Sequence, residues 1–544
     1  MLKRCHLVWI TGVVWIVLGT TASAVDVVVV CDASFREAMQ PWTRDREEQG
    51  LDIAWVAPQV SAVRQAAVIR DVADEDTKNV LLVGAAPVFG SHRVGSQIPM
   101  FREPTTVTRK FQSTLDFVTD RGYADLNRDG SPDAAVGRLP VRTVDELRVV
   151  LGKILRNDRS LDFGTWRRNV ELVGGVGGFG PLIDTTIETV TRSILTASLP
   201  KETSTGLLYA SPGHRFFPRR RSFREAVVKR YQSDCRFWVY AGHGRITELD
   251  RFPRTRLGRP ILDGPAIGRL PTRDRPAPIA LLLACYTGAL DAPERSFADQ
   301  WVTHPGGPTA LIAGSRVTMP YGNASLALRL IDGIYTRRDR TLGESWVRAI
   351  RSLEDPNSEV PGATGKWVDS LSAVLSPARG ESAAERLEHA SLYQLLGDPT
   401  MKLHPPRELR IDAPRGIPFG EVLNIEVESD IAGTLTLGID RPLGSDAMGR
   451  DERGGDEFSN PNERTLLQCQ HPIRAGVATT ITLDLKRVTA AKSSPSEDSP
   501  SVHAPSANLP SGWVQVWAHV AGDQAWAAGA VSVNIRDQEK PTSQ

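Results

Sequence analysis

Short apolar strands alternate with amphipathic helices along most of this 544-residue chain, and this alternation constrains the fold more than any other feature. From Val25 onward the order is strand, helix, strand, helix, strand, in the segments VDVVVVC, ASFREAMQPWTRDREEQG, LDIAWVAP, SAVRQAAVIRDVAD and NVLLVGAAP. Apolar strands separated by amphipathic helices are typical of parallel βαβ units. The pattern therefore predicts an α/β fold.

A second series of the same kind starts near Arg167. Its strands are NVELVGG, TGLLYAS, CRFWVYAGHG, PIALLLAC and PTALIAGS, with helices expected at 184–198, 222–232 and 296–303. The strands are continuously apolar, as expected where helices cover both faces of a sheet. Because a chain of this length exceeds a single core, we predict two α/β subdomains with parallel sheets, at residues 25–160 and 161–404.

The sequence changes character after YQLLGDPTMKLHPP. The segments LNIEVES, TLTLGID, TTITLDLKR, WVQVWAHV and AVSVNIRD alternate or carry β-branched residues, with no helix between them. This pattern predicts an antiparallel β-sandwich at residues 405–544. Within it, KSSPSEDSPSVHAPSANLPSG is rich in serine and proline and is expected to be a flexible insert.

Residues 1–24 have the pattern of a signal peptide. Lys3 and Arg4 precede an apolar segment from Leu7 to Leu18, and Ala22-Ser23-Ala24 supplies the small residues of a cleavage site. A membrane anchor would need about 20 apolar residues, more than this segment has. We therefore expect an exported protein without a later membrane span, in the periplasm, on the cell surface or released.

Charge and cysteine content exclude two other classes of protein. Lysine and arginine total 65 against 64 for aspartate and glutamate, so no overall field attracts nucleic acid or an anionic membrane. After signal cleavage only Cys31, Cys235, Cys285 and Cys469 remain, too few for a disulfide framework. Cys31, Cys235 and Cys469 read as packing residues, since none shares a strand end with a histidine and glycines.

His243 and Cys285 follow two apolar strands at matching positions, in FWVYAGHG and IALLLAC. The carboxyl ends of strands in open parallel sheets form the ligand crevice, so the two side chains should lie close together. A thiolate there would attack a carbonyl carbon, and the histidine would protonate the departing amine. The amides of Gly244 and Cys285 would bind the developing oxyanion. Taken singly, either side chain reads as structural; together they indicate nucleophilic catalysis.

Four strings of this sequence resemble gingipain-type cysteine peptidases of the caspase-like clan: YAGHG, LLLACYTG, DLNRDGSPDAAVGRLPV and LLGDPTMKL. The resemblance covers about residues 25–403 and implies a caspase-like α/β fold followed by an immunoglobulin-like domain. It implies an endopeptidase acting on proteins or peptides, with Cys285 as nucleophile, His243 as general acid/base and Gly244 as oxyanion donor. Gingipains carry a long propeptide, whereas the first βαβ series here begins directly after the expected cleavage.

Asp184 follows the glycine-rich segment GGVGGFG, at the start of an expected helix. From there it could approach the crevice and accept a hydrogen bond from the His243 ring, which would make it the residue that orients the histidine. The alternative is an acid at a helix N-terminus, stabilised by the helix dipole. The sequence leaves both interpretations open.

The segment DLNRDGSPD raises the question of a metal. At the first, third, fifth and ninth positions of a calcium-loop pattern stand Asp125, Asn127, Asp129 and Asp133. The twelfth position is Val136, so the usual bidentate glutamate is missing. Oxygen ligands at alternate residues suit a hard cation, so we expect a structural Ca²⁺; a plain Asp/Gly turn is the alternative.

Two further segments offer competing interpretations. GGVGGFG matches G-x-G-x-x-G at Gly175, Gly177 and Gly180, but Pro181 stands where the helix should begin and the next strand ends without the acid expected for a ribose. A loop that shapes the rim of the crevice fits better than a dinucleotide site. The basic run RFFPRRRSFREAVVKR reads as solvated surface or as a processing site.

The sequence therefore predicts an exported cysteine endopeptidase with a Cys-His dyad. Two alternatives stay open: a catalytically inactive caspase-like scaffold or binding protein, and a nucleotide-binding enzyme that uses the glycine loop. A reactive-thiol probe separates the first interpretation from both, because a catalytic cysteine alkylates selectively.

Overall fold

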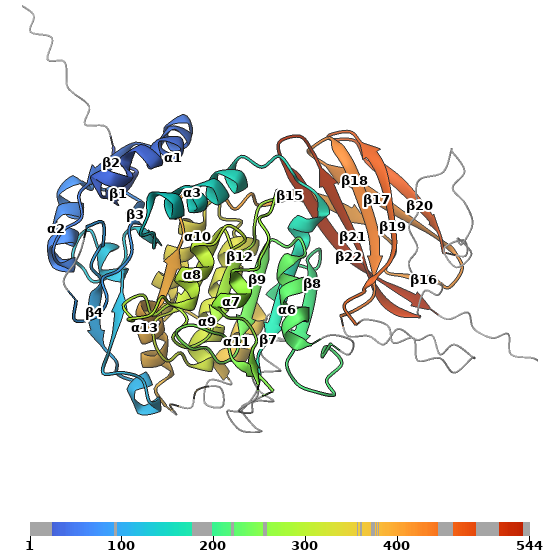
Figure 1. Ribbon diagram of the computed structural model, residues 1–544. Helices are drawn as coiled ribbons and strands as arrows, with labels where there is room; N and C mark the ends of the chain where they lie inside the picture. The colour runs from blue at the N-terminus through green and yellow to red at the C-terminus, as the bar shows by residue number, and fades with distance from the viewer. Residues whose placement is uncertain are drawn as a thin grey trace, which may run out of the picture.

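The computed structural model describes residues 24–91, 95–176, 198–218, 222–253, 258–355, 357–359, 362–370, 376, 378, 380–443, 461–485 and 511–536. The N-terminal helices lie at one end of the molecule, a large sheet at its centre and a β-sandwich at the other end (Figure 1). Outside the described residues lie the expected signal segment up to residue 23, Asp184 with most of its expected helix, residues 219–221 of the basic run and nearly all of the serine/proline insert.

One ten-stranded sheet forms the centre, in the order β2-β1-β3-β6-β14-β13-β12-β9-β7-β8. Its strands are β1 (Val27–Cys31), β2 (Ile53–Val56), β3 (Asn79–Val83), β6 (Ala135–Leu139), β7 (Asn169–Gly174), β8 (Ser204–Tyr209), β9 (Phe237–Ala241), β12 (Ile279–Leu283), β13 (Ala310–Gly314) and β14 (Tyr393–Leu396). Two small antiparallel pairs join β4 (Phe101–Pro104) to β5 (Asp116–Thr119) and β10 (Arg251–Phe252) to β11 (Arg259–Pro260).

The two halves of the central sheet run in opposite directions. β14 pairs in parallel with β6 but antiparallel with β13. Parallel pairs connect the other strands within each half. The α/β class and the strands of both series are confirmed, but the expectation of separate parallel sheets is wrong. The sheet is single and mixed because β14, a four-residue strand that no pattern predicted, joins the halves.

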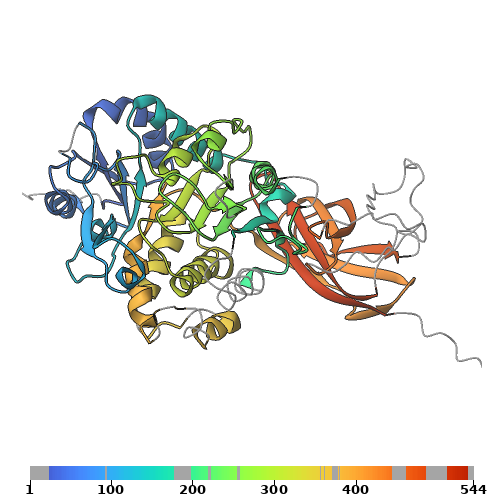
Figure 2. The same ribbon diagram turned by 60° about the horizontal axis from the view of Figure 1, so that its bottom comes forward.

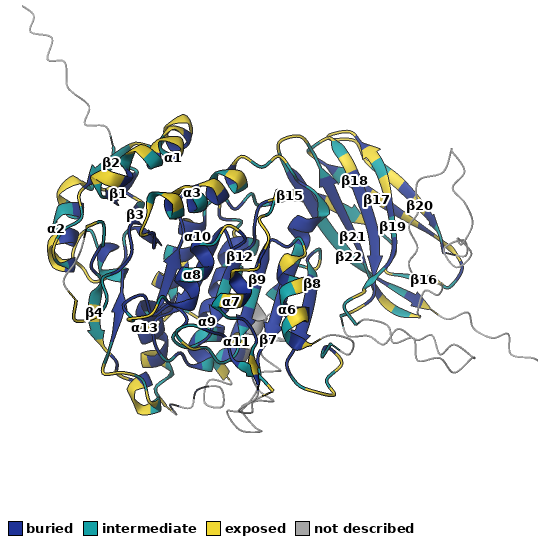
Figure 3. Ribbon diagram, in the orientation of Figure 1, coloured by how far each residue is buried: buried dark blue, intermediate teal, exposed yellow. Residues whose placement is uncertain are grey.

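Helices cover both faces of this sheet. They are α1 (Arg36–Glu48), α2 (Ala62–Val72), α3 (Val144–Asp158), α6 (Phe223–Gln232), α7 (Gly264–Ile267), α8 (Phe297–Thr303), α9 (Pro320–Ile331), α10 (Leu342–Glu354), α11 (Gly362–Ser370) and α13 (Ser382–Leu392). Successive side chains of a strand point to opposite faces. Accordingly Leu283 packs in the core formed with α1, α3, α9 and α10, whereas Leu282 and Ala284 pack in the core formed with α6 and α8. The strands are buried, and exposed residues lie on the outer faces of the helices (Figure 3).

The C-terminal β-sandwich has its own core and comprises β15 (Arg407–Asp412), β16 (Gly416–Pro418), β17 (Val422–Ser429), β18 (Gly433–Asp440), β19 (Thr465–Ile473), β20 (Thr479–Asp484), β21 (Gly512–Ala521) and β22 (Trp526–Arg536). It is not fully antiparallel, since β15 and β16 pair in parallel with β22. Both views place it beyond β8 (Figures 1 and 2). There Asn462 exchanges two hydrogen bonds with the main chain of Leu207, at 2.7 and 3.0 Å, and covers part of this sheet edge.

None of the helices in the described ranges is long and apolar enough to span a membrane.

Candidate active site

The register of β9 and β12 brings the expected histidine and cysteine to the same edge of the sheet. Ala241 lies opposite Leu283 in this parallel pair. The ladder continues one step further, because the Gly242 amide donates to the Leu283 carbonyl at 3.2 Å. His243 and Cys285 each follow two residues after the paired positions, and both are half-buried. Matching strand ends were the basis of the sequence prediction, and the register agrees with it.

The main chains of the two strand ends are in contact at Gly244. A Cβ at this position would lie 2.6 Å from the Cys285 carbonyl oxygen and 2.7 Å from Cγ2 of Thr287, so a larger residue does not fit without movement. Gly244 forms an antiparallel bridge with Leu249, and the bridging hydrogen bonds are made by the flanking residues. In such a pair the Gly244 N–H points away from Leu249. Its amide is therefore not used in this bridge, and the role of Gly244 as an oxyanion donor stays a prediction.

The glycine-rich segment begins against the strand end of His243. A Cβ on Gly175 would lie 2.5 Å from the Tyr240 hydroxyl oxygen and 3.1 Å from Cα of Gly242. The Tyr240 hydroxyl donates to the His243 carbonyl at 2.9 Å, which fixes the backbone of the histidine. Gly175 is thus needed for close packing beside the site, as expected of a rim loop. Gly177, Gly180 and Asp184 lie outside the described residues, so the orienting role of Asp184 stays a prediction.

Cys285 differs from the other cysteines of the described chain. Cys31, Cys235 and Cys469 are buried, and burial raises the pKa of each thiol. Burial also raises the pKa of Cys285, but hydrogen bonds from Thr318 act in the opposite direction. The Thr318 amide donates to Sγ at 3.3 Å. Cys285 alone therefore combines partial exposure with a donor to its sulfur.

The turn after Cys285 is held by residues that the sequence did not indicate. Tyr286 has a φ of 59°, in the left-handed region, and its amide donates to the Arg316 carbonyl at 2.9 Å. The Arg316 guanidinium binds both oxygens of Asp291, at 3.0 and 2.7 Å, so its charge is neutralised beside the turn. No spacing rule connects Asp291 with Arg316, because they come from the ends of different strands.

The expected calcium loop binds its own backbone. The Asp133 carboxylate accepts from the amides of Leu126 and Asn127, at 2.9 and 3.0 Å, and Asp125 accepts from the Arg128 amide at 2.7 Å. The Asn127 side chain donates to Asp129 and Asp133, both at 3.1 Å. Val136 is buried in β6, so the twelfth position offers no ligand. Among the described residues no group of three or more His, Cys, Asp or Glu side chains is arranged to hold a metal ion.

A thiol and an imidazole at adjacent ends of parallel strands, with helices on both faces, are the arrangement expected of caspase-like cysteine peptidases. Residues 20–404 match the model of peptidase family C25. This match spans well over half of the chain, and the chain therefore belongs to peptidase family C25, a family of cysteine peptidases. No curated protein sequence matches the chain significantly.

Solved structures resemble the chain in fold. The crystal structure of the Arg-specific cysteine proteinase gingipain R matches with a TM-score of 0.50 at 13% identity, covering 95% of this chain and 98% of that one. A structure titled only as a protease also reaches 0.50 at 13% identity, covering 84% and 97%. The complex of pro- and mature domains of RgpB from Porphyromonas gingivalis has a TM-score of 0.49 at 13% identity, covering 94% and 100%. The two matches with a TM-score of 0.50 support the gingipain-like fold.

Proposed function

We propose that this protein is an exported cysteine endopeptidase that hydrolyses peptide bonds in proteins with Cys285 and His243 as its catalytic pair. The observation that carries the proposal is the register of β9 and β12, in which Ala241 pairs with Leu283. His243 and Cys285 each follow two residues after this pair. The close contact between Gly244 and the Cys285 carbonyl supports it. Export is proposed from the N-terminal pattern of residues 1–24.

In this proposal the Cys285 thiolate attacks the carbonyl carbon of the scissile bond. A C–S bond forms while the carbonyl π electrons move to the oxygen, and the Gly244 and Cys285 amides donate to the resulting oxyanion. As the C–N bond breaks, the amine takes a proton from the His243 imidazolium and leaves a thioester. His243 then accepts a proton from the water that attacks the thioester, which releases the acid product and restores Cys285.

The test compares Cys285→Ala and His243→Ala with the purified mature protein on a labelled protein substrate. We expect each variant to lose at least about a thousandfold in kcat/KM, with an unchanged Tm, because neither side chain is part of the buried core. Cys469→Ala, which removes a buried thiol in the sandwich, is the matched control and should keep its activity. Activity retained by Cys285→Ala would disprove the proposal.

We propose structural calcium as a separate point, at the loop of Asp125, Asn127, Asp129 and Asp133. The support is the spacing of the four side chains and their partly exposed position on the loop before β6. A bound ion would compete with the loop amides for the same oxygens, so the proposed site would be weak.

A further inference from the structure

The sulfur of Cys285 is held from the β13 side of its strand. The Thr318 amide donates to Sγ at 3.3 Å. The sulfur also lies 3.6 Å from the Thr318 carbonyl oxygen and 3.8 Å from its hydroxyl. β12 has β9 on one side, which leads to His243, and β13 on the other, which leads to Thr318. The thiol therefore has a donor on the flank opposite the strand of the histidine.

Thr318 is itself held by two part-buried hydrogen bonds in series. Asn323, in the first turn of α9, donates to the Thr318 hydroxyl at 3.2 Å. The Tyr393 hydroxyl, at the start of β14, donates to Oδ1 of Asn323 at 2.7 Å. Burial raises the pKa of Tyr393, so this hydroxyl stays protonated and remains the donor. We call Thr318, Asn323 and Tyr393 the Thr318 relay.

The residue after Thr318 is anchored by a neutral histidine. The Met319 amide donates to Nε2 of His389 at 2.7 Å, and Nδ1 of the same ring lies 2.7 Å from the Glu385 carbonyl oxygen. Since a carbonyl oxygen only accepts, Nδ1 carries the proton and Nε2 is the acceptor. Gly322 packs directly on this ring, where a Cβ would lie 2.4 Å from it. The start of α9 is thus locked against α13.

These contacts bear on the ionisation of the thiol. An N–H donor stabilises a thiolate, and the positive end of a helix dipole does the same. Thr318 precedes the first turn of the 12-residue α9 and offers both effects. Titratable or charged groups on the elements packed beside this site include His243, two residues after β9, Tyr393 of β14, His389 and Glu385 of α13, and the paired Arg316 and Asp291 of the loops after β13 and β12.

We propose that the Thr318 relay positions the Cys285 sulfur and stabilises its thiolate, so that Thr318, Asn323 and Tyr393 are positioning residues of the peptidase. This inference rests on the proposed function of Cys285. Burial alone would leave the thiol protonated at neutral pH. The relay opposes that effect with neutral donors, which do not draw a competing charge into the site.

The test measures the rate at which iodoacetamide alkylates Cys285 as a function of pH, by mass spectrometry of the Cys285 peptide. Asn323→Ala, Tyr393→Phe and Thr318→Val each remove a member of the relay, and Thr318→Ser keeps the hydroxyl. We expect the midpoint of alkylation to rise by about 0.5 to 1 pH unit in the first three variants and to stay near that of the wild type in Thr318→Ser. kcat/KM at neutral pH should fall about threefold to tenfold, mainly through kcat.

Tyr231→Phe is the matched control, because Tyr231 is equally buried and donates its hydroxyl to a backbone carbonyl, that of Gly306, at 2.9 Å. It should leave the midpoint unchanged. Folded relay variants with the wild-type midpoint would overturn the inference, and so would a shifted midpoint with an unchanged kcat/KM. Peptidase activity of Cys285→Ala would instead disprove the proposed function, whatever the alkylation profile, so the two failures are distinguishable.

Discussion

β14 is four residues long, and its two ends have contrasting surroundings. At its start, Tyr393 donates into the Thr318 relay, whose neutral groups hold a half-buried sulfur. Two residues beyond its end, Asp398 receives a hydrogen bond from the Trp42 indole at 2.5 Å and pairs with Arg46 at 2.7 Å. One end thus contacts the surroundings of the proposed nucleophile, and the other contacts charged groups that are buried away from water.

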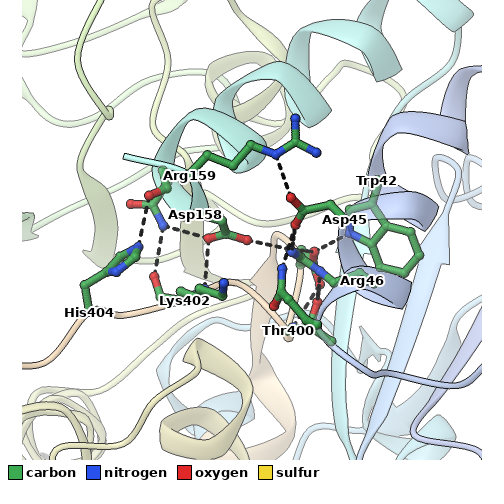
Figure 4. A network of polar contacts seen from close by, with 11 residues as sticks. Trp42, Asp45, Arg46, Asp158, Arg159, Thr400, Lys402 and His404 are labelled. Atoms are coloured by element: carbon green, nitrogen blue, oxygen red, sulfur yellow. Dashed lines mark hydrogen bonds and ion pairs between the residues drawn. The ribbon is translucent and has the colours of Figure 1, made fainter. Parts of the chain in front are cut away.

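The charges at the second end form what we call the Arg46 cluster: Arg46, Asp45, Asp158 and Asp398. Figure 4 shows Arg46 between Asp45 and Asp158. Arg46 has no exposed side-chain area and binds Asp45 and Asp158 at 2.6 Å each. The cluster joins the C-terminal parts of α1 and α3 to the segment after β14. A buried charge is tolerated only when it is paired and hydrogen-bonded, and here Thr400 also accepts from Nε of Arg46, at 2.7 Å.

Three of the sequence strings that resemble gingipains fall into two groups, one at each end of β14. Of the strings that resemble gingipains, LLGDPTMKL supplies Asp398 and Thr400 to the Arg46 cluster, whereas YAGHG and LLLACYTG supply the candidate active site. The string LLGDPTMKL holds together elements that are far apart in the sequence, whereas the other two strings present the partly accessible side chains of His243 and Cys285. Mutations at the two ends of β14 should therefore differ in whether they change stability or turnover.

The largest expected effect is on stability, in Arg46→Met. This change leaves three carboxylates without their shared buried cation, and we expect a loss of about 3 to 5 kcal/mol in the free energy of unfolding. Urea denaturation measures it. Activity per folded molecule should stay near that of the wild type, because Arg46 lies beyond the other end of β14.

The control for this prediction is Arg159→Met. Arg159 also binds Asp45, at 2.6 Å, but its side chain is 55% exposed, so its loss should cost less than about 1 kcal/mol. Equal losses in the two variants would contradict the view that burial gives the Arg46 cluster its importance.

The next effect is a dependence of stability on pH, at the junction between the α/β region and the β-sandwich. His519 is buried and Nε2 lies 2.7 Å from the Phe163 carbonyl oxygen. Burial, together with the charges of Arg168 and Arg167, lowers the pKa of His519 to about 4. A pKa below that of the unfolded chain gives stability that is present above pH 6.5 and is lost as the pH falls toward 4. His519→Gln removes this titration and should reduce the loss by up to about 3 kcal/mol.

The stability contributed by the Arg46 cluster should change with pH in the opposite direction. Burial raises the pKa of Asp158 to about 6, so its contribution to stability is present below the unfolded pKa of about 3.8 and is lost as the pH rises through 6. Unfolding free energies at pH 4 to 7 measure both effects. Asp158→Asn should make the acid-side loss steeper, whereas His519→Gln should make it shallower. The same slope in both variants would refute the assignment of these two groups.

A smaller effect is expected at the contact between the strand ends of the candidate active site. In Gly244→Ala the added Cβ would meet the Cys285 carbonyl oxygen at 2.6 Å, so the proposed oxyanion donor and the proposed nucleophile must move apart. We expect kcat/KM to fall about a hundredfold, which corresponds to about 2.7 kcal/mol. The measurement is steady-state hydrolysis of a peptide substrate, with Tm as the check on folding.

Gly152→Ala is its matched control, because Gly152 lies in α3 with nothing within 4 Å of the added Cβ. This change should leave turnover unaltered and raise stability by about 0.5 to 1 kcal/mol, the usual advantage of alanine over glycine in a helix. A loss of turnover in Gly152→Ala as large as that in Gly244→Ala would remove the argument from close contact.

Local pattern was sufficient to predict the strands of the two α/β series and to put His243 and Cys285 just beyond two neighbouring strand ends. Apolar runs determine which segments enter the sheet, and the ends of parallel strands meet at one edge. The opposite directions of the two halves depend on β14, whose four residues carry no periodic signal. They could not be predicted, because strand direction is set by tertiary packing.

The supporting residues also escaped prediction. Thr318 lies 33 positions from Cys285, and nothing in SRVTMP distinguishes it from any other loop hydroxyl. Arg46 stands in TRDREEQG, where charges of both signs read as the exposed face of a helix. Contacts between such distant side chains exist only in the folded chain.

The smallest expected effect is on thermal stability, at the loop of Asp125, Asn127, Asp129 and Asp133. Its acids are partly or fully exposed, unlike the Arg46 cluster, and backbone amides donate to Asp133 and Asp125. Calcium at about ten times its Kd would add about 1.4 kcal/mol by preferential binding to the folded state, or 2 to 4 °C in Tm. Chelation should remove this increment and calcium should restore it, and Asp125→Asn should abolish the response. An unchanged Tm after calcium is added to protein shown to be free of metal would leave the loop as a hydrogen-bonded turn. The acids of this loop and those of the Arg46 cluster would then both be stabilised by the protein's own hydrogen-bond donors, and the two sites would differ in burial.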